Sequence, residues 1–254
     1  MIGPATSATR CFGYPLAAAV FAASLYALPP LPAHAAGGAF VVDDTDIAKA
    51  GDCKVESYVS KADNGDFLVS STPACVFNLL QPVEIGTQFQ RFRFGGIWDT
   101  TLTVKAKTNI VDYEKNPYGL AVSGGTSFDL ITGENLGSYV NVPFSLKVGE
   151  QWRVNLNVGS LYDNTVNRLW LTWGAGFERN FVKQFTLLGE VFGQLGHNDP
   201  MFPDLASPRA QLGLRYNPVE NIDVDVIYGR NITGVDANWI TLGVNVRFTA
   251  FASK

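Results

Sequence analysis

Apolar and polar residues alternate one by one along most of this chain, and this pattern constrains its fold more than any other feature. The clearest case is residues 240–248, where every second residue is apolar and those between are Thr241, Gly243, Asn245 and Arg247. A period of two is typical of a β-strand with one apolar and one polar face. Similar runs recur back to about residue 53. The pattern predicts an all-β, antiparallel up-and-down architecture of about twelve strands, with ten or fourteen as alternatives.

The first three expected strands, residues 53–60, 66–78 and 82–94, alternate less regularly than the rest. The phase of the alternation slips near Gln90 and Arg91. An extra residue in one strand of a pair would shift the phase in this way, so we expect a β-bulge there.

The expected connections alternate in length. Short turns fall at residues 147–150, 180–183 and 217–220, whereas longer polar loops fall at 162–168, 196–209 and 230–238. Residues 112–118 break the rule, being long where a short turn is expected. Short turns at one end and long loops at the other are typical of outer-membrane β-barrels.

Alternation alone does not say whether the apolar face points inward or toward lipid. A closed barrel of twelve strands is wider than the eight-stranded barrels whose interiors side chains can fill, so an apolar lumen would leave a void. We therefore expect a transmembrane barrel with a polar lumen. The alternative is a secreted β-sandwich with two apolar inner faces.

Aromatic residues near the strand ends support a membrane barrel. Trp239 and Phe248 lie nine residues apart on the last strand, which corresponds to roughly 23 Å of height for a tilted strand. That height matches the apolar band of an outer-membrane barrel. The expected aromatic girdle consists of Trp152, Trp173, Tyr216, Trp239 and Phe248.

Residues 1–35 read as a cleaved export signal. Residues 1–36 hold Arg10 as their only fixed charge, and residues 16–28 form an apolar core too short to span a bilayer. Pro29, Pro30 and Pro32 follow, before the small-x-small site at 33–35. The rest divides into a periplasmic or lumenal segment (36–52), the barrel (53–248) and a short tail (249–254). Export through the Sec route to a bacterial outer membrane is expected.

Two cysteines, Cys53 and Cys75, remain after cleavage, in a compartment that permits disulfides. A hairpin centred on Asn64 would place them opposite one another, because their numbers sum to twice 64. That placement suits a disulfide. The alternative is a pair of buried free thiols.

By alternation, many charged residues share the lumen face. Hairpin pairing predicts a row Arg215–Asp223–Arg247 near the periplasmic end. Lys147 and Arg153 would face one another, so Glu178 is expected to lie nearby as their partner. Other residues expected in the lumen are Lys105, Lys107, Asp129, Glu190 and Asp225. These charges either brace the walls or form a selectivity constriction for charged solutes.

Catalytic and metal motifs are scarce. The sequence has no GxSxG, HExxH, GxxxxGK[ST] or CxxC. His197, beside Asp199, is the one histidine after residue 36, and we expect neither catalysis nor a cofactor. Asp43, Asp44 and Asp46 could bind Ca²⁺, but a solvated N-terminal segment is the expectation we prefer. A net charge of −4 argues against nucleic-acid binding.

Four segments carry a resemblance to known proteins. Residues 239–248 resemble the assembly signal of Gram-negative outer-membrane proteins. The start at residues 40–44, with Gly51 and Glu56, is similar to putative outer-membrane transporters of the MetA-pathway phenol-degradation type. Residues 170–193 and 228–234 resemble uncharacterised proteobacterial barrels. The resemblance implies a barrel and a channel for small organic compounds. Residues 249–254 extend beyond Phe248, where the family pattern ends.

Two classes of function follow. The first is a passive channel for small solutes, including organic ones. The second is a non-conducting barrel that gives structure or presents loops as a receptor or adhesin. A plug formed by residues 37–52 would favour the second. Membrane lipid, lipopolysaccharide and the barrel-assembly machinery are the expected partners.

Overall fold

The structure, a computed structural model, describes residues 38–196, 208–234 and 236–251. The expected signal peptide (1–35), His197 with Asp199, and residues 252–254 of the tail lie outside these ranges. The strands are β1 (Asp52–Ala62), β2 (Phe67–Asn78), β3 (Pro82–Phe94), β4 (Ile97–Val111), β5 (Tyr118–Asp129), β6 (Asn135–Val148), β7 (Trp152–Asp163), β8 (Arg168–Val182), β9 (Phe185–Leu195), β10 (Arg209–Val219), β11 (Ile222–Asn231) and β12 (Asn238–Thr249). The described residues contain no helix long and apolar enough to cross a membrane.

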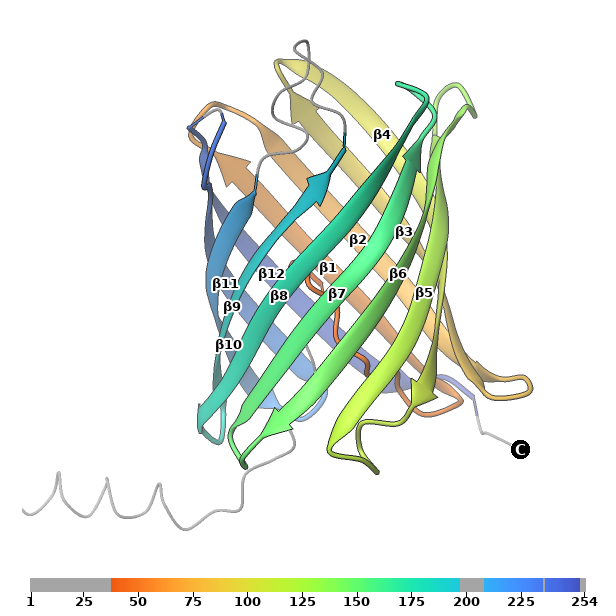
Figure 1. The fold of residues 1–254 in the computed structure, drawn as a ribbon, viewed down its shortest axis with the longest axis vertical. Coiled ribbons are helices and arrows are strands. Elements are labelled where there is room, and N and C mark those ends of the chain that lie inside the picture. Colours follow the sequence, from red (N-terminus) through yellow and green to blue (C-terminus); the bar gives the residue numbers. More distant parts are fainter. Residues whose placement is uncertain (1–37, 197–207, 235, 252–254) are drawn as a thin grey trace, which may run out of the picture. The chain divides into compact units, whose positions relative to one another are not determined.

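Each strand pairs antiparallel with its sequence neighbours, and β1 pairs with β12 to close the barrel (Figure 1). Asp52 and Thr249 are register partners, so the barrel begins and ends at the same end, here called the terminal end. The opposite end, with the connections 130–134, 164–167 and 232–237, is called the loop end. The predicted fold, a closed up-and-down barrel of twelve antiparallel strands, is confirmed.

The barrel wall is apolar outside and polar inside. Val158, Leu242 and Ile240 are more than half exposed on the outer face. Buried polar side chains face the lumen, among them Asn155 and Thr241. This is the reverse of a soluble protein and matches a wall in contact with lipid.

The expected bulge at Gln90–Arg91 is wrong. Gln90 pairs with Ser70 on β2 and with Thr101 on β4 in an unbroken register. The polarity pattern changes there because Arg91 and its neighbour Arg93 face outward at the loop end. Their guanidinium carbons lie 5.1 and 5.8 Å from the centre of the Trp98 ring. A strand that passes beyond the apolar band can carry outward charge without any change of register.

The predicted disulfide is confirmed. Cys53 and Cys75 are directly opposed on β1 and β2, with a disulfide bond and a Cα–Cα distance of 4.0 Å. The bond lies at the terminal end, two residues after the chain leaves the lumen. It therefore fixes the first hairpin close to the point where the N-terminal segment joins the wall.

Residues 38–51, here called the strap, lie inside the barrel (Figure 1, orange). Phe40 of the strap packs against Leu188 of β9 and Ile227 of β11, which form a small apolar cluster within the lumen. The expectation of a solvated N-terminal segment is therefore wrong. Asp44 and Thr45 are 1% and 0% exposed, because the lumen wall offers partners for the polar groups of the strap.

Candidate functional site

Backbone groups of the strap bind to side chains on β7 and β9. The Glu190 carboxylate accepts hydrogen bonds from the backbone N–H groups of Val41 (2.8 Å) and Val42 (2.9 Å). Asn157 accepts from the N–H of Asp43 at 2.8 Å and donates to the carbonyl of the same residue at 2.6 Å. These bonds replace the strand pairing that an isolated segment in the lumen lacks, so the strap has a defined position.

Glycines in the wall make room for the strap side chains. A Cβ atom on Gly174 of β8 would lie 2.7 Å from Cγ2 of Val42. A Cβ atom on Gly213 of β10 would lie 2.7 Å from Cζ of Phe40. Real Cβ contacts are longer, so the wall is shaped to accept these two apolar side chains.

Acidic residues of the strap form ion pairs with lumen cations. Asp46 accepts two hydrogen bonds from the Arg153 guanidinium on β7, both at 2.8 Å. Lys107 of β4 lies 2.8 Å from Asp43 and 3.4 Å from Asp44. The strap thus contacts Lys107 on β4 and Glu190 on β9, two strands that lie far apart in the closed ring. It therefore crosses the lumen from one part of the wall to another.

Burial raises the pKa of Asp44 to about 7, while the nearby charges of Lys107 and Arg153 act in the opposite direction. One of its carboxylate oxygens, Oδ2, has no hydrogen-bond partner in the described residues. The strap therefore carries a carboxyl group whose protonation changes near neutral pH.

The arginine row at β10–β12 has a different register from the one expected. Arg215 pairs with Asp225 rather than Asp223, because the turn lies between Val219 and Ile222 and is not centred on Val219. A one-residue shift between Tyr216 and Val219 offsets part of this difference. Asp223 pairs with Asn245 rather than Arg247. Arg215 and Arg247 still contact Asp223, because the long arginine side chain can reach a residue diagonally across the neighbouring strand.

Arg215 holds Asp225 through Nε–Oδ1 (2.7 Å) and Nη2–Oδ2 (2.9 Å), and its Nη1 lies 3.9 Å from Asp223. Arg247 also donates to Asp223. Arg215, Asp223 and Asp225 are 1%, 0% and 0% exposed. This lattice braces three strands in the wall.

The pair at the β6–β7 turn has the expected register. Lys147 is opposite Arg153, and Glu178 lies 4.0 Å from Arg153 Nε. Both cations also lie over the ring of Tyr113 in the 112–117 connection, at 4.6 and 3.9 Å. Asp129 lies on the lumen face of β5, opposite Thr101, and it caps the turn after β5 by accepting from two backbone N–H groups.

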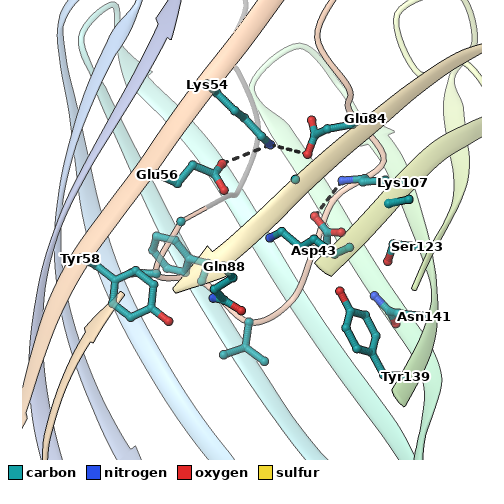
Figure 2. A pocket seen from close by; sticks show the side chains of 17 residues that line it. Asp43, Lys54, Glu56, Tyr58, Glu84, Gln88, Lys107, Ser123, Tyr139 and Asn141 are labelled. Atoms are coloured by element: carbon teal, nitrogen blue, oxygen red, sulfur yellow. Dashed lines mark hydrogen bonds and ion pairs between the residues drawn. The ribbon is translucent and has the colours of Figure 1, made fainter. Parts of the chain in front are cut away.

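A cavity of about 260 Å³, here called the charged chamber, lies between the strap and strands β1 and β3–β6 (Figure 2). Lys54 bridges Glu56 at 3.2 Å and Glu84 at 3.1 Å in its lining. The sequence interpretation did not select these three residues, although they share one face by alternation, because the first strands are irregular. Lys105 and Lys107, which it did select, line the same chamber.

A second cavity of about 680 Å³, here called the vestibule, opens at the loop end. Its lining includes Phe92, Phe192 and Trp239. The assignment of Trp239 to the outer girdle is therefore wrong. Its odd number places it on the lumen face of β12, where its indole N–H donates to Gln211 at 3.3 Å.

The other predicted girdle residues face outward. Trp152, Tyr216 and Phe248 are 40%, 38% and 48% exposed near the terminal end, and Trp173 lies on the face of β8 opposite Gly174. Stacked rings extend this belt through Phe185–Tyr216 (4.9 Å) and Tyr118–Phe144 (6.1 Å). Such a ring of aromatics is typical of a membrane interface.

Among the described residues, no group of three or more His, Cys, Asp or Glu side chains is placed to hold a metal ion. Asp43, Asp44 and Asp46, considered as calcium ligands, are instead matched with Lys107 and Arg153. The positive charges of Lys107 and Arg153 account for the burial of these acids, and no metal ion is needed to explain it.

An apolar outer face, an aromatic belt and a charged lumen together define the fold of outer-membrane barrels. The KdgM porin in complex with disordered oligogalacturonate is similar, with 11% identity, a TM-score of 0.59 and coverage of 77% of this chain and 99% of that chain. The NanC porin has 9% identity, a TM-score of 0.57 and coverage of 76% and 98%. The COG4313 outer membrane channel from Pseudomonas putida F1 has 11% identity, a TM-score of 0.55 and coverage of 81% and 98%.

The chain belongs to the family described as "Uncharacterised conserved protein UCP029691", whose match spans residues 24–248. A search of the curated proteins found no match. The structural likenesses show a shared fold, and the function has to be argued from the lumen itself.

Proposed function

We propose that this protein is a passive outer-membrane channel for small solutes, with a path that runs beside the strap. The observation that carries the proposal is the relation between the two cavities. The vestibule and the charged chamber share the lining residues Ala39, Val41 and Tyr58. A solute that enters at the loop end therefore meets a narrowing at the strap and then a charged compartment.

The outer-membrane location is supported by the apolar outer face and by the fold shared with outer-membrane porins. Lipid, lipopolysaccharide and the barrel-assembly machinery would then be the partners of the outer wall and of folding. The aromatic side chains of the vestibule, Phe92, Phe192 and Trp239, are compatible with organic solutes of the kind that the sequence resemblance implies.

A second candidate is a non-conducting barrel, and the strap is the observation that favours it. The strap binds Glu190 on one part of the wall and Lys107 on another, as a plug would. Neither candidate assigns catalysis to the chain.

Liposome swelling separates the two candidates. The refolded protein would be reconstituted and exposed to neutral sugars of increasing size, beside a variant that lacks residues 38–49. We expect swelling with the smallest sugars for the unchanged protein, and with larger sugars for the variant. Swelling by the variant alone would make the strap a closed plug, and swelling by neither folded protein would favour the non-conducting barrel.

A further inference from the structure

We infer that the charged chamber contains a subsite for the carboxylate of a small polyhydroxylated solute, formed by Lys105 and Tyr139. The inference rests on the proposed channel function, because only a solute that enters the lumen can reach this position. The solute that this subsite would bind is a small sugar acid.

The lysines of the chamber differ in their partners. Lys54 is held by Glu56 and Glu84, and Lys107 is held by Asp43 and Asp44 of the strap. Each of these two lysines is thus matched by two carboxylates. Within the described parts of the chain, Lys105 forms no ion pair, although its side chain lines the same chamber. Its ammonium group is therefore left for a mobile anion.

The register places a glycine on each side of Lys105. Its partners on β3 and β5 are Gly86 and Gly125, and Gly125 in turn pairs with Tyr139 on β6. A Cβ atom on Gly125 would lie 2.8 Å from Cε1 of Tyr139 and 3.1 Å from Cβ of Lys105. The Tyr139 ring therefore packs over Gly125 beside the base of the Lys105 side chain, and both side chains line the chamber.

Hydrogen-bonding groups line the chamber beside these two side chains. In the part of the chain that the structure describes, the side-chain hydroxyls of Tyr139 and Ser123 have no hydrogen-bond partner, and both line the chamber. Figure 2 shows Ser123, Asn141 and Tyr139 along one side of it. An ammonium and a phenol are good donors to a carboxylate, and the remaining hydroxyl and amide groups suit the hydroxyls of a sugar acid.

The carboxylates of the chamber set the orientation of the solute. Glu56, Glu84 and Asp43 each lie within ion-pair distance of a lysine. The same three carboxylates also act electrostatically on Lys105, but none lies within ion-pair distance of it. The charge of a bound anion would therefore be placed at Lys105, whose ammonium has no carboxylate in direct contact. A cavity of about 260 Å³ limits the occupant to a small molecule.

Equilibrium dialysis of the refolded protein with radiolabelled gluconate tests this assignment, and glucose serves as a neutral probe of the same size. We expect gluconate to bind and glucose not to. Lys105→Gln should weaken gluconate binding by about tenfold or more, because it removes a charge-assisted hydrogen bond. Lys105→Arg keeps the positive charge and should retain binding. Tyr139→Phe should weaken it by a smaller factor.

Lys61→Gln is the matched control, because Lys61 is an exposed lysine on the outer face of β1. Heat-modifiability on a gel would establish that each variant is folded. Equal binding of gluconate and glucose, or unchanged binding by Lys105→Gln, would overturn the subsite. Binding without any conductance would instead overturn the channel and leave the subsite in place, so the two failures are distinguishable.

Discussion

The carboxylate of Glu190 accepts a hydrogen bond of 2.9 Å from the backbone N–H of Val42, a residue 148 positions earlier in the chain. Glu190 lies on the barrel wall and Val42 lies on the strap, so this bond joins the strap to the wall. The same carboxylate accepts from Val41 and from Gln211.

Glu190→Gln should loosen the strap, because an amide keeps one oxygen acceptor where the carboxylate offers two. The loss of one such bond to a charged acceptor is worth about 1–3 kcal/mol. A thiol at the fully buried position Thr45, made by Thr45→Cys, reports release of the strap through its rate of maleimide labelling. We expect labelling to rise about 5- to 150-fold. Glu134→Gln, at an exposed loop residue, is the control and should leave the rate unchanged.

Gly174→Ala should also release the strap, because the added Cβ would lie 2.7 Å from Val42. Overpacking of this kind costs about 1–3 kcal/mol. Gly243→Ala is the matched control, since a Cβ on this lumen glycine would meet its nearest atom at 3.4 Å. In a Val42→Ala background the effect of Gly174→Ala on Thr45→Cys labelling should disappear. An effect that persists there would contradict the proposed contact.

Release of the strap should increase as the pH rises. Burial raises the pKa of Asp44 to about 7 in the docked strap, whereas an exposed aspartate has a pKa near 3.9. Asp44 therefore loses a proton on release, and its stabilisation of docking is complete below about pH 4 and lost as the pH approaches 7. Labelling of Thr45→Cys, normalised to the denatured protein at each pH, should rise across this range.

Asp44→Asn should flatten that pH profile, because the amide does not titrate. Asp43 and Asp46 lie close by and face Lys107 and Arg153. Because these two carboxyl groups can also titrate, the comparison with Asp44→Asn is needed to assign the pH dependence to Asp44. A labelling profile of Thr45→Cys with Asp44 intact that falls with rising pH would contradict the assignment.

The arginine lattice should dominate the stability of the wall. Asp225→Ala removes a buried partner of Arg215 and leaves its charge poorly compensated, at a cost of about 3–5 kcal/mol. The exposed pair Arg230–Asp236, at 3.7 Å, gives the control. Asp236→Ala should change the free energy of unfolding by no more than about 1 kcal/mol. Urea unfolding of the refolded variants in lipid vesicles measures both, and equal losses would contradict the account.

The sequence was sufficient for the wall of the barrel. Period-two alternation gives strands and their faces directly, because each residue of a strand points to the side opposite its neighbours. The pairing of Cys53 with Cys75 followed from one turn with regular hairpin geometry. The pairing of Arg215 was predicted two residues away from the observed one, because the alternation does not fix the centre of the turn, which lies between Val219 and Ile222 and not at Val219.

The strap could not be predicted from the same pattern. Residues 38–51 have no periodicity, and their position depends on partners far away in the sequence, such as Glu190 for Val42 and Arg153 for Asp46. A cluster of three aspartates reads as solvated until the matching cations are known. The glycines that receive the strap, such as Gly174, have no distinguishing mark among many wall glycines. Long-range complementarity of this kind appears only in three dimensions.

Single-channel recording in a planar bilayer tests the central claim most directly. The refolded protein at high salt should give discrete conductance steps, and Gly174→Ala should give larger ones, because the strap occupies part of the path. Gly243→Ala should match the unchanged protein. Absence of steps from protein that is folded by heat-modifiability, in both the unchanged chain and Gly174→Ala, would contradict a channel beside the strap.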